Sequence, residues 1–358
     1  MTSPRIGLAL SGGGFRATAF GLGCLRALHD RDLLRWVSVV SGISGGSLLT
    51  AMWAYGPADF AEFDDSVTRL LRSGLQSELV RRAFAPGAAL KSTGSALRAV
   101  VPGKHRGYSR TDALVSALSS REFGSRSLQD VTHPDMSVVL SATDMVTGNA
   151  VRFGSQVSSC SAHGKIIDPV TVAEAVAASA AFPLLLPAMA RTYEFEDHNG
   201  ARAARKVVMT DGGVYDNLGL SPLLPNRSIA HTNHAYDLDF LIAADAGRGR
   251  SHRRAARFFV SRLSQSFDIT YAKTQDASRS RIHDAASSGQ IKGFVHAYLG
   301  MRDQNLPTPL PDLVPRARVD RYPTNFAAMR AEDLTAVAVR GEQLTRALLG
   351  YYHPELDG

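Results

Sequence analysis

The sequence predicts an α/β fold in which helices cover both faces of a mostly parallel sheet. Residues 1–55 alternate strand, helix, strand and helix, a pattern typical of parallel strands joined by helical crossovers. Apolar runs of strand length recur later in the chain, separated by segments with helical spacing. A chain of 358 residues, 44% of them hydrophobic, can bury the core that this fold needs.

The first four elements are defined by their apolar pattern. Ile6–Leu10 is a continuous apolar run, and Ala17–His29 follows it with apolar residues at helical spacing. Trp36–Val40 is a second apolar run, and Ser47–Tyr55 continues as a helix. This unit predicts two neighbouring parallel strands.

Residues 56–134 interrupt the alternation. Helical stretches at Phe60–Leu75 and Thr111–Ser119 surround a middle part that contains Gly, Pro and Ser. We expect a helical insertion that caps one end of the sheet, where lids are often found.

The alternation returns with Met136–Ala142 and Ala150–Phe153, a predicted hairpin around Thr147-Gly148-Asn149. The same signals give the remaining elements: a helix at Val170–Ala181 stopped by Pro183, strands at Lys206–Met209, Phe240–Ala244 and Ile291–Tyr298, a long helix or helix pair from Arg253 to about Ser287, and a helix at Asp333–Leu349. We expect one domain over residues 1–358, with 249–358 as a mainly helical C-terminal extension.

Composition excludes several classes of protein. Charged residues make up 20% of the chain, which argues against disorder. The two cysteines, Cys24 and Cys160, imply no disulfide framework and no thiolate metal site. No secretory signal precedes Ile6, and the most apolar window, 172–190, is interrupted by Glu and Pro. We therefore expect a cytoplasmic protein, at most peripheral at the inner face of the membrane.

The net charge of +7 is concentrated between residues 248 and 262. This basic segment contains six arginines and no acidic residue, interleaved with Phe258 and Phe259. It fits a solvated helix face that packs its aromatic rings inward, or docking on an anionic membrane surface. No nucleic-acid motif accompanies it, so no nucleic-acid partner is expected.

Gly42-Ile43-Ser44-Gly45-Gly46 has the G-x-S-x-G form of a nucleophile elbow, with Ser44 as the candidate nucleophile. A helix N-cap after a buried strand is the alternative interpretation of Ser44.

Ser11-Gly12-Gly13-Gly14 follows the first strand and leads into a helix, so its backbone N–H groups are suited to holding an oxyanion. Gly12, Gly14 and Ala17 also fit the dinucleotide fingerprint G-x-G-x-x-A. The acid that this fingerprint expects is missing, because Asp30 and Asp32 fall before the second apolar run.

The base that serves Ser44 has two kinds of candidate. Of the eleven histidines, those considered after Ser44 have no strand-end glycine setting that would fix their geometry: His231, His234, His252 and His283. Asp211 ends a predicted strand, and Gly212 and Gly213 leave room for close approach by another element. A carboxylate base needs a pKa raised by desolvation, and an ordinary D-G turn is the alternative interpretation of Asp211.

Four segments in this order resemble the patatin-like phospholipase family, which includes relatives of cytosolic phospholipase A2. They are Ser11–Arg16, Gly42–Gly46, Ala178–Pro183 with Pro187, and Asp211–Gly213. Ala142-Thr143-Asp144 with Thr147-Gly148 is similar to a hairpin of this family. The resemblance spans roughly residues 5–247 and implies a three-layer patatin-like fold.

The resemblance implies a Ser44–Asp211 catalytic dyad without histidine. It also implies an oxyanion hole around Gly12, Gly13 and Gly14, with amides from the last two and Gly12 shaping the turn. Substrate-binding roles are expected for Arg16, Ser179, Phe182 and Pro183, with a salt-bridged structural role as the alternative for Arg16.

The implied function is a serine lipid acyl hydrolase of phospholipase A or lysophospholipase type. It requires neither metal nor cofactor, and its substrate is a phospholipid or another acyl-ester lipid. A carboxylesterase or thioesterase and a non-catalytic lipid- or nucleotide-binding protein remain alternatives. An activator protein or signalling nucleotide is compatible with the sequence, which does not identify one.

Overall fold

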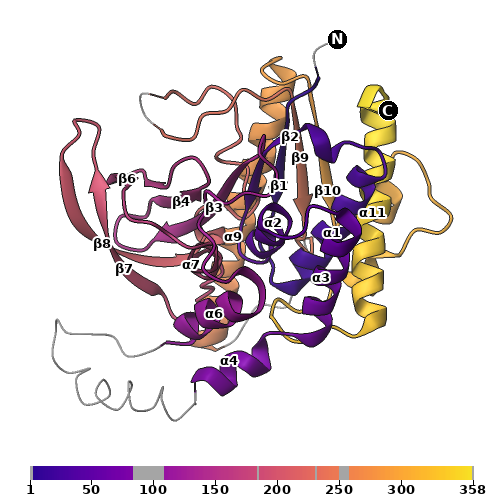
Figure 1. The fold of residues 1–358 in the computed structure, drawn as a ribbon. Coiled ribbons are helices and arrows are strands. Elements are labelled where there is room, and N and C mark those ends of the chain that lie inside the picture. The colour runs from indigo at the N-terminus through magenta and orange to yellow at the C-terminus, as the bar shows by residue number, and fades with distance from the viewer. Residues whose placement is uncertain (1–2, 84–108, 184, 230–231, 250–257, 357–358) are drawn as a thin grey trace.

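The computed structural model describes residues 3–83, 109–183, 185–229, 232–249 and 258–356. Within them, ten strands form one sheet in the order β10-β9-β1-β2-β3-β4-β5-β6-β7-β8 (Figure 1). The strands are β1 (Ile6–Leu10), β2 (Val37–Gly42), β3 (Ser137–Asp144), β4 (Ala150–Gly154), β5 (Ser159–Cys160), β6 (Gly164–Ile166), β7 (Met189–Glu196), β8 (Arg202–Asp211), β9 (Phe240–Asp245) and β10 (Gly293–Tyr298).

Along the chain, the helices lie between strands or follow the last strand. They are α1 (Phe15–His29), α2 (Gly45–Tyr55), α3 (Phe60–Ser73), α4 (Gln76–Ala83), α6 (Arg110–Leu118), α7 (Val172–Ser179), α8 (Gly213–Asp216), α9 (Phe259–Ser287), α10 (Arg316–Val319) and α11 (Ala331–Tyr352). None of these described helices combines the length and apolarity needed to cross a bilayer.

The sheet is mixed, so the expectation of a mostly parallel sheet is wrong for its second half. From β10 through β3 the neighbouring strands run parallel. From β3 to β8 they run antiparallel, and β8 pairs back with β3, which closes a ring. The chain reverses at the tight turn before β4, where Gly148 has a φ of +71°. The hairpin itself confirms the Thr147–Asn149 prediction, whereas β5, β6 and β7 were not predicted.

Helices cover both faces of the parallel half, which confirms the three-layer expectation for this part. Ile6, Leu8 and Leu10 pack in the core that α1, α2 and α11 share. Ala9 points to the other face, in a core shared with Ile282 of α9. Because side chains alternate along β1, a central strand supplies both cores.

The segment after residue 249 contributes to the central sheet as well as to the helical layers. β10 pairs with β9 at the sheet edge, and α11 lies along α1 (Figure 1). A single helix, α9, occupies 259–287, and the part of the expected helix before residue 258 lies outside the described residues.

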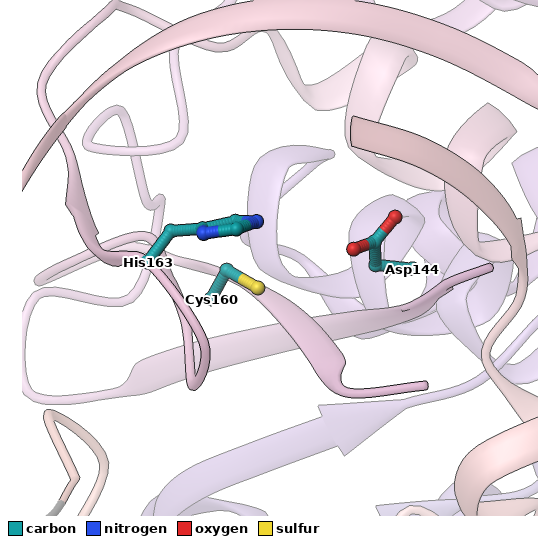
Figure 2. A group of neighbouring side chains, drawn as sticks. All are labelled: Asp144, Cys160 and His163. Carbon is teal, nitrogen blue, oxygen red and sulfur yellow. The ribbon is translucent and has the colours of Figure 1, made fainter. Parts of the chain in front are cut away.

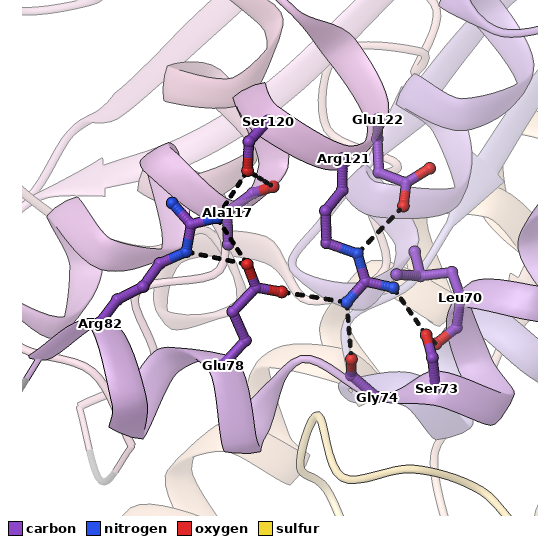
Figure 3. A network of polar contacts seen from close by, with 9 residues as sticks. All are labelled: Leu70, Ser73, Gly74, Glu78, Arg82, Ala117, Ser120, Arg121 and Glu122. Carbon is purple, nitrogen blue, oxygen red and sulfur yellow. Dashed lines mark hydrogen bonds and ion pairs between the residues drawn. The ribbon is translucent and has the colours of Figure 1, made fainter.

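Within 56–134, α4 is fastened by a polar network (Figure 3). Glu78 accepts from Arg82 at 2.6 Å and pairs with Arg121 at 3.2 Å. Arg121 also donates to the Gly74 carbonyl at 3.0 Å and to the Ser73 hydroxyl at 2.6 Å. The network joins the end of α3, α4 and the turn after α6, and residues 84–108 between these helices lie outside the described residues.

Close backbone packing of α1 on α11 generates a stability prediction. A methyl group at Gly23 would overlap the Ala338 carbonyl oxygen. We expect Gly23→Ala to lower the free energy of unfolding by about 1–3 kcal/mol, because overpacking outweighs the helix propensity of alanine. Denaturant unfolding measures this.

Gly350→Ala is the matched control, since Gly350 lies exposed in α11. There alanine should stabilise the protein by up to about 1 kcal/mol. Equal effects of the two substitutions would contradict close packing at Gly23.

Candidate active site

The candidate site forms where the adjacent parallel strands β1 and β2 end. Each strand leads through a short turn into a helix, β1 into α1 and β2 into α2. The Ile43 amide donates to the Leu10 carbonyl at 3.0 Å, which keeps the two turns in register. The carboxyl ends of parallel strands are the usual place for ligands in open α/β sheets.

Glycines allow the two turns to touch backbone to backbone. A methyl group at Gly45 would overlap the Gly14 carbonyl oxygen, and one at Gly46 would overlap the Leu10 carbonyl oxygen. Gly14 also has a φ of +59°, which disfavours any side chain there. The N-termini of α1 and α2 therefore converge, and both present positive dipole ends to the same place.

Ser44 sits between β2 and α2 in a strained conformation. It is non-glycine with φ +53° and ψ −117°, and it is 5% exposed. Its amide donates to the Ser179 hydroxyl at 3.0 Å. Strain of this kind is typical of a nucleophile held on a sharp strand–helix turn.

The glycine triplet offers free amides beside Ser44. The Gly12 amide donates to the Asn217 carbonyl at 3.0 Å, so Gly12 shapes the turn and offers no donor. The amides of Gly13 and Gly14 have no acceptor within the described part of the chain. Two free amides near a hydroxyl are the arrangement that stabilises a tetrahedral oxyanion.

Asp211 ends β8 and lies buried next to Ser44. Its amide donates to the Ala181 carbonyl at 3.0 Å, and its Oδ1 accepts from the Gly213 amide at 2.7 Å. Burial raises the pKa of Asp211 to about 6, although hydrogen bonds from the Ser44 side chain and the Gly213 amide lower it. The carboxyl thus titrates close to neutral pH, as a general base at this site must.

The Ser179 hydroxyl contacts other groups of the protein, and its expected contact with substrate stays a prediction. The fully buried hydroxyl accepts from the Ser44 amide and donates to the Ser141 carbonyl at 2.6 Å. The Ser47 hydroxyl, 2.7 Å away, is the third hydrogen-bond partner of the Ser179 hydroxyl. Because these groups occupy the hydroxyl, Ser179 is a positioning residue for Ser44.

The guanidinium of Arg16 is hydrogen-bonded within the protein, and its expected contact with substrate stays a prediction. It donates to the Ala246 carbonyl at 2.9 Å, to the Tyr322 carbonyl at 2.8 Å and to the Thr324 hydroxyl at 2.8 Å. These bonds tie the glycine turn to the end of β9 and to the segment before α11. Carbonyl and hydroxyl groups thus hold the Arg16 guanidinium in place.

Phe182 and Pro183 follow the end of α7, beside the strand end that carries Asp211. Phe182 is half-buried and Pro183 is exposed. The Ala181 carbonyl that precedes them accepts from Asp211 and from the Thr210 hydroxyl. Their expected contact with substrate stays a prediction.

Within the described residues, no hydrogen bond joins a histidine to Ser44 or Asp211. His234 is fully buried next to Tyr236, and burial lowers its pKa to about 3. His283 packs against Phe294, while His231 and His252 lie outside the described residues.

The acidic half of the dinucleotide fingerprint is missing from the structure as well. Asp30 caps the end of α1, and Asp32 lies in the turn before η1 (Leu34–Trp36), away from the carboxyl end of β2.

Two positioning residues were not predicted. Ser47 reaches Ser179 from the first turn of α2, and Asn217 reaches Gly12 through its carbonyl. The Asn217 Oδ1 is buried, has no hydrogen-bond partner among the residues that the structure describes, and lies where a Gly12 side chain would be. Both residues could have been found from their spacing in the sequence, because Ser47 lies three residues after Ser44 and Asn217 lies six residues after Asp211.

Comparisons with known proteins agree with this architecture. The sequence matches the family described as patatin-like phospholipase over residues 8–224. No curated protein sequence matches the chain.

Among solved structures, human GIVD cytosolic phospholipase A2 is similar in fold, with a TM-score of 0.59 and 13% identity. The alignment covers 99% of this chain and 60% of that one, so the chain spans less than two thirds of this relative. The same human protein in complex with methyl gamma-linolenyl fluorophosphonate gives a TM-score of 0.56 at 15% identity, covering 99% of this chain and 58% of that one.

The buried carboxyl generates a pH-dependent stability prediction. Because the pKa of Asp211 is higher folded than unfolded, the native state binds the extra proton, and stability falls as pH rises from about 4 to 6. At pH 8 we expect Asp211→Asn to raise the free energy of unfolding by up to about 3 kcal/mol, and much less at pH 4. Urea unfolding at both pH values measures the difference.

Asp65→Asn is the control, because Asp65 is exposed on α3. It should change stability little at either pH. A gain from Asp211→Asn that is the same at both pH values would contradict a raised pKa.

Proposed function

Because the chain belongs to the patatin-like phospholipase family, we propose that it hydrolyses acyl esters of lipids with Ser44 as nucleophile and Asp211 as base. The observation that carries this proposal is the buried Asp211 carboxyl beside Ser44, because a pKa that burial raises to about 6 suits proton abstraction.

In the first half-reaction, the Ser44 hydroxyl oxygen attacks the ester carbonyl carbon while its proton passes to Asp211. The negative charge that develops on the carbonyl oxygen is held by the free amides of Gly13 and Gly14. Each such donor is typically worth about 3–4 kcal/mol in the transition state. The dipoles of α1 and α2 favour the same charge.

The tetrahedral intermediate then collapses. The bond to the leaving alkoxide breaks, Asp211 gives its proton to the alkoxide, and an alcohol departs from an acyl-Ser44 ester. In the second half-reaction, water loses a proton to Asp211 and attacks the acyl carbon. Release of the fatty acid returns the proton to the Ser44 oxygen. An alkoxide leaves more easily than an amine, so esters suit this dyad.

The substrate class proposed is a phospholipid or lysophospholipid. The complex of the human relative with a lipid-chain fluorophosphonate supports the proposal, because fluorophosphonates as a class react with activated serine hydroxyls. A carboxylesterase or thioesterase would use the same Ser44 chemistry. A lipid-binding protein without turnover would keep the fold alone.

Contact with an anionic membrane through residues 248–262 stays a prediction. Arg250, Arg253, Arg254 and Arg257 of this segment lie outside the described residues. We also propose that 56–134 caps the site and that residues 1–358 act as one catalytic unit. Control by an activator protein or a signalling nucleotide is likewise untested.

The dyad prediction is tested by fatty-acid release from mixed phospholipid vesicles. We expect Ser44→Ala and Asp211→Asn each to lower kcat by at least about a thousandfold, since a nucleophile and its base act as a unit. Labelling with a fluorophosphonate probe should be reduced in the same two variants. Ser66→Ala, on α3, is the control and should retain full release.

Release that survives in Asp211→Asn would move the base to another residue and refute the dyad. Release by the wild type from soluble esters or thioesters alone would favour the esterase or thioesterase alternative.

The pKa of Asp211 also sets the pH dependence of hydrolysis. Its ionised form is the base, so kcat/KM should fall about tenfold per pH unit below about 6. Measurement with a soluble short-chain ester separates this effect from vesicle binding. A flat profile between pH 5 and 8 would count against Asp211 as the base.

A further inference from the structure

Asp144, Cys160 and His163 gather at the ring of antiparallel strands, and the proposed dyad does not use their side chains (Figure 2). One ligand atom from each residue lies within 4.8 Å of those from the other two. Asp144 comes from the end of β3, and Cys160 and His163 come from the β5–β6 hairpin. Although the cysteine count implied no thiolate metal site, we propose that these three side chains bind a divalent transition-metal ion such as Zn²⁺.

The hairpin holds two of the ligands side by side. Cys160 and His163 are separated by two residues, and the His163 amide donates to the Cys160 carbonyl at 3.0 Å. Gly164 follows with a φ of +101°, and a methyl group there would overlap the Glu196 carbonyl oxygen. The turn is therefore fixed, and a short Cys-x-x-His spacing on a fixed turn is a familiar way to present sulfur and nitrogen to one metal.

The third ligand is an oriented carboxylate. Asp144 is fully buried and accepts from the Thr147 hydroxyl at 2.8 Å and from the Val208 amide at 3.1 Å. The Val146 and Thr147 amides also donate to this carboxylate, at 3.3 and 3.2 Å. Ligating carboxylates are commonly hydrogen-bonded in this way.

The charge of Asp144 lacks a cationic partner. In the described part of the chain, neither lysine nor arginine forms an ion pair with it. Val151, Phe153 and Met209 of the surrounding strands are buried in one core, and β4 also carries the buried Arg152, whose charge acts on Cys160. A buried anion next to a thiol and an imidazole is an environment in which a cation is stabilised.

The geometry needs only a small adjustment to accept zinc. Tetrahedral zinc with bonds of about 2.0–2.3 Å places its ligand atoms roughly 3.3–3.8 Å apart, so the three side chains must close by about 1 Å. His163 is partly exposed, which gives the ion a route from solvent and leaves a fourth position for water. The thiolate, imidazole and carboxylate set favours zinc over magnesium or calcium.

The ion would join β3 to the hairpin and so brace the ring that carries Asp211. Ala142 of β3 pairs with Asp211, and the Thr143 hydroxyl donates to the Asp211 carbonyl at 3.0 Å. A metal at Asp144 would therefore stabilise the strand that positions the candidate base, without touching the reacting atoms.

Cobalt titration of the full chain tests the site, after treatment with chelator and its removal. We expect one equivalent of Co²⁺ to give a thiolate-to-cobalt charge-transfer band that Zn²⁺ displaces, together with a rise in Tm. Cys160→Ser should abolish the band, and His163→Ala should weaken binding by at least about tenfold.

The matched control is Cys24→Ser, because Cys24 is the other cysteine and packs between α1 and α11. It should keep the band and the displacement by zinc. Circular dichroism establishes that each variant is folded. If Cys160→Ser is unstable, Asp144→Asn takes its place and should also weaken cobalt binding. Absence of a thiolate band in the wild type at excess cobalt, or its survival in folded Cys160→Ser, would overturn the proposal.

Discussion

The backbone contact between Gly14 and Gly45 is the constraint on which the candidate site depends. It brings the first turn of α1 against the first turn of α2, with no side chain between them. That approach places the free amides of Gly13 and Gly14 next to Ser44. Even one methyl group at this contact would separate the helix N-termini, so the two glycine motifs act as one structural unit.

Ser179 extends this unit to the rest of the sheet. One buried hydroxyl links the Ser44 amide to the Ser141 carbonyl of β3, and the Ser179 carbonyl accepts from the Gly212 amide at 3.2 Å. The strained turn at Ser44 and the strand end at Asp211 are therefore held by the same residue. Such a network explains how a non-glycine residue keeps a φ of +53°.

The site carries a cost in stability that its chemistry needs. Burying Asp211 raises its pKa, which makes the carboxyl a better base near neutral pH and a less favourable charge in the folded protein. Partial compensation comes from the Gly213 amide at 2.7 Å. Active sites commonly keep such conflicts, because function selects for the raised pKa.

Much of the fold and site could be predicted from the sequence, because the required signals are local. Continuous apolar runs gave β1, β2 and β9, and the glycine positions gave both turns. The ring strands β5 and β6 escaped prediction because they are two and three residues long. β7 escaped although Met189, Tyr193 and Phe195 are buried along it, since Arg191 stands on the same face and interrupts the alternation.

The sequence by itself determined where the turns are and which residues stand at the strand ends, since glycine spacing and apolar runs act over a few residues. The tertiary structure decided what those residues touch. Only packing between distant segments shows that Arg16 donates to the Ala246 and Tyr322 carbonyls and that the Ser44 amide donates to Ser179. The same is true of the pairing of β8 with β3. The burial of a side chain and its hydrogen-bond partners are set by segments far apart in the chain, and no local sequence pattern contains that information.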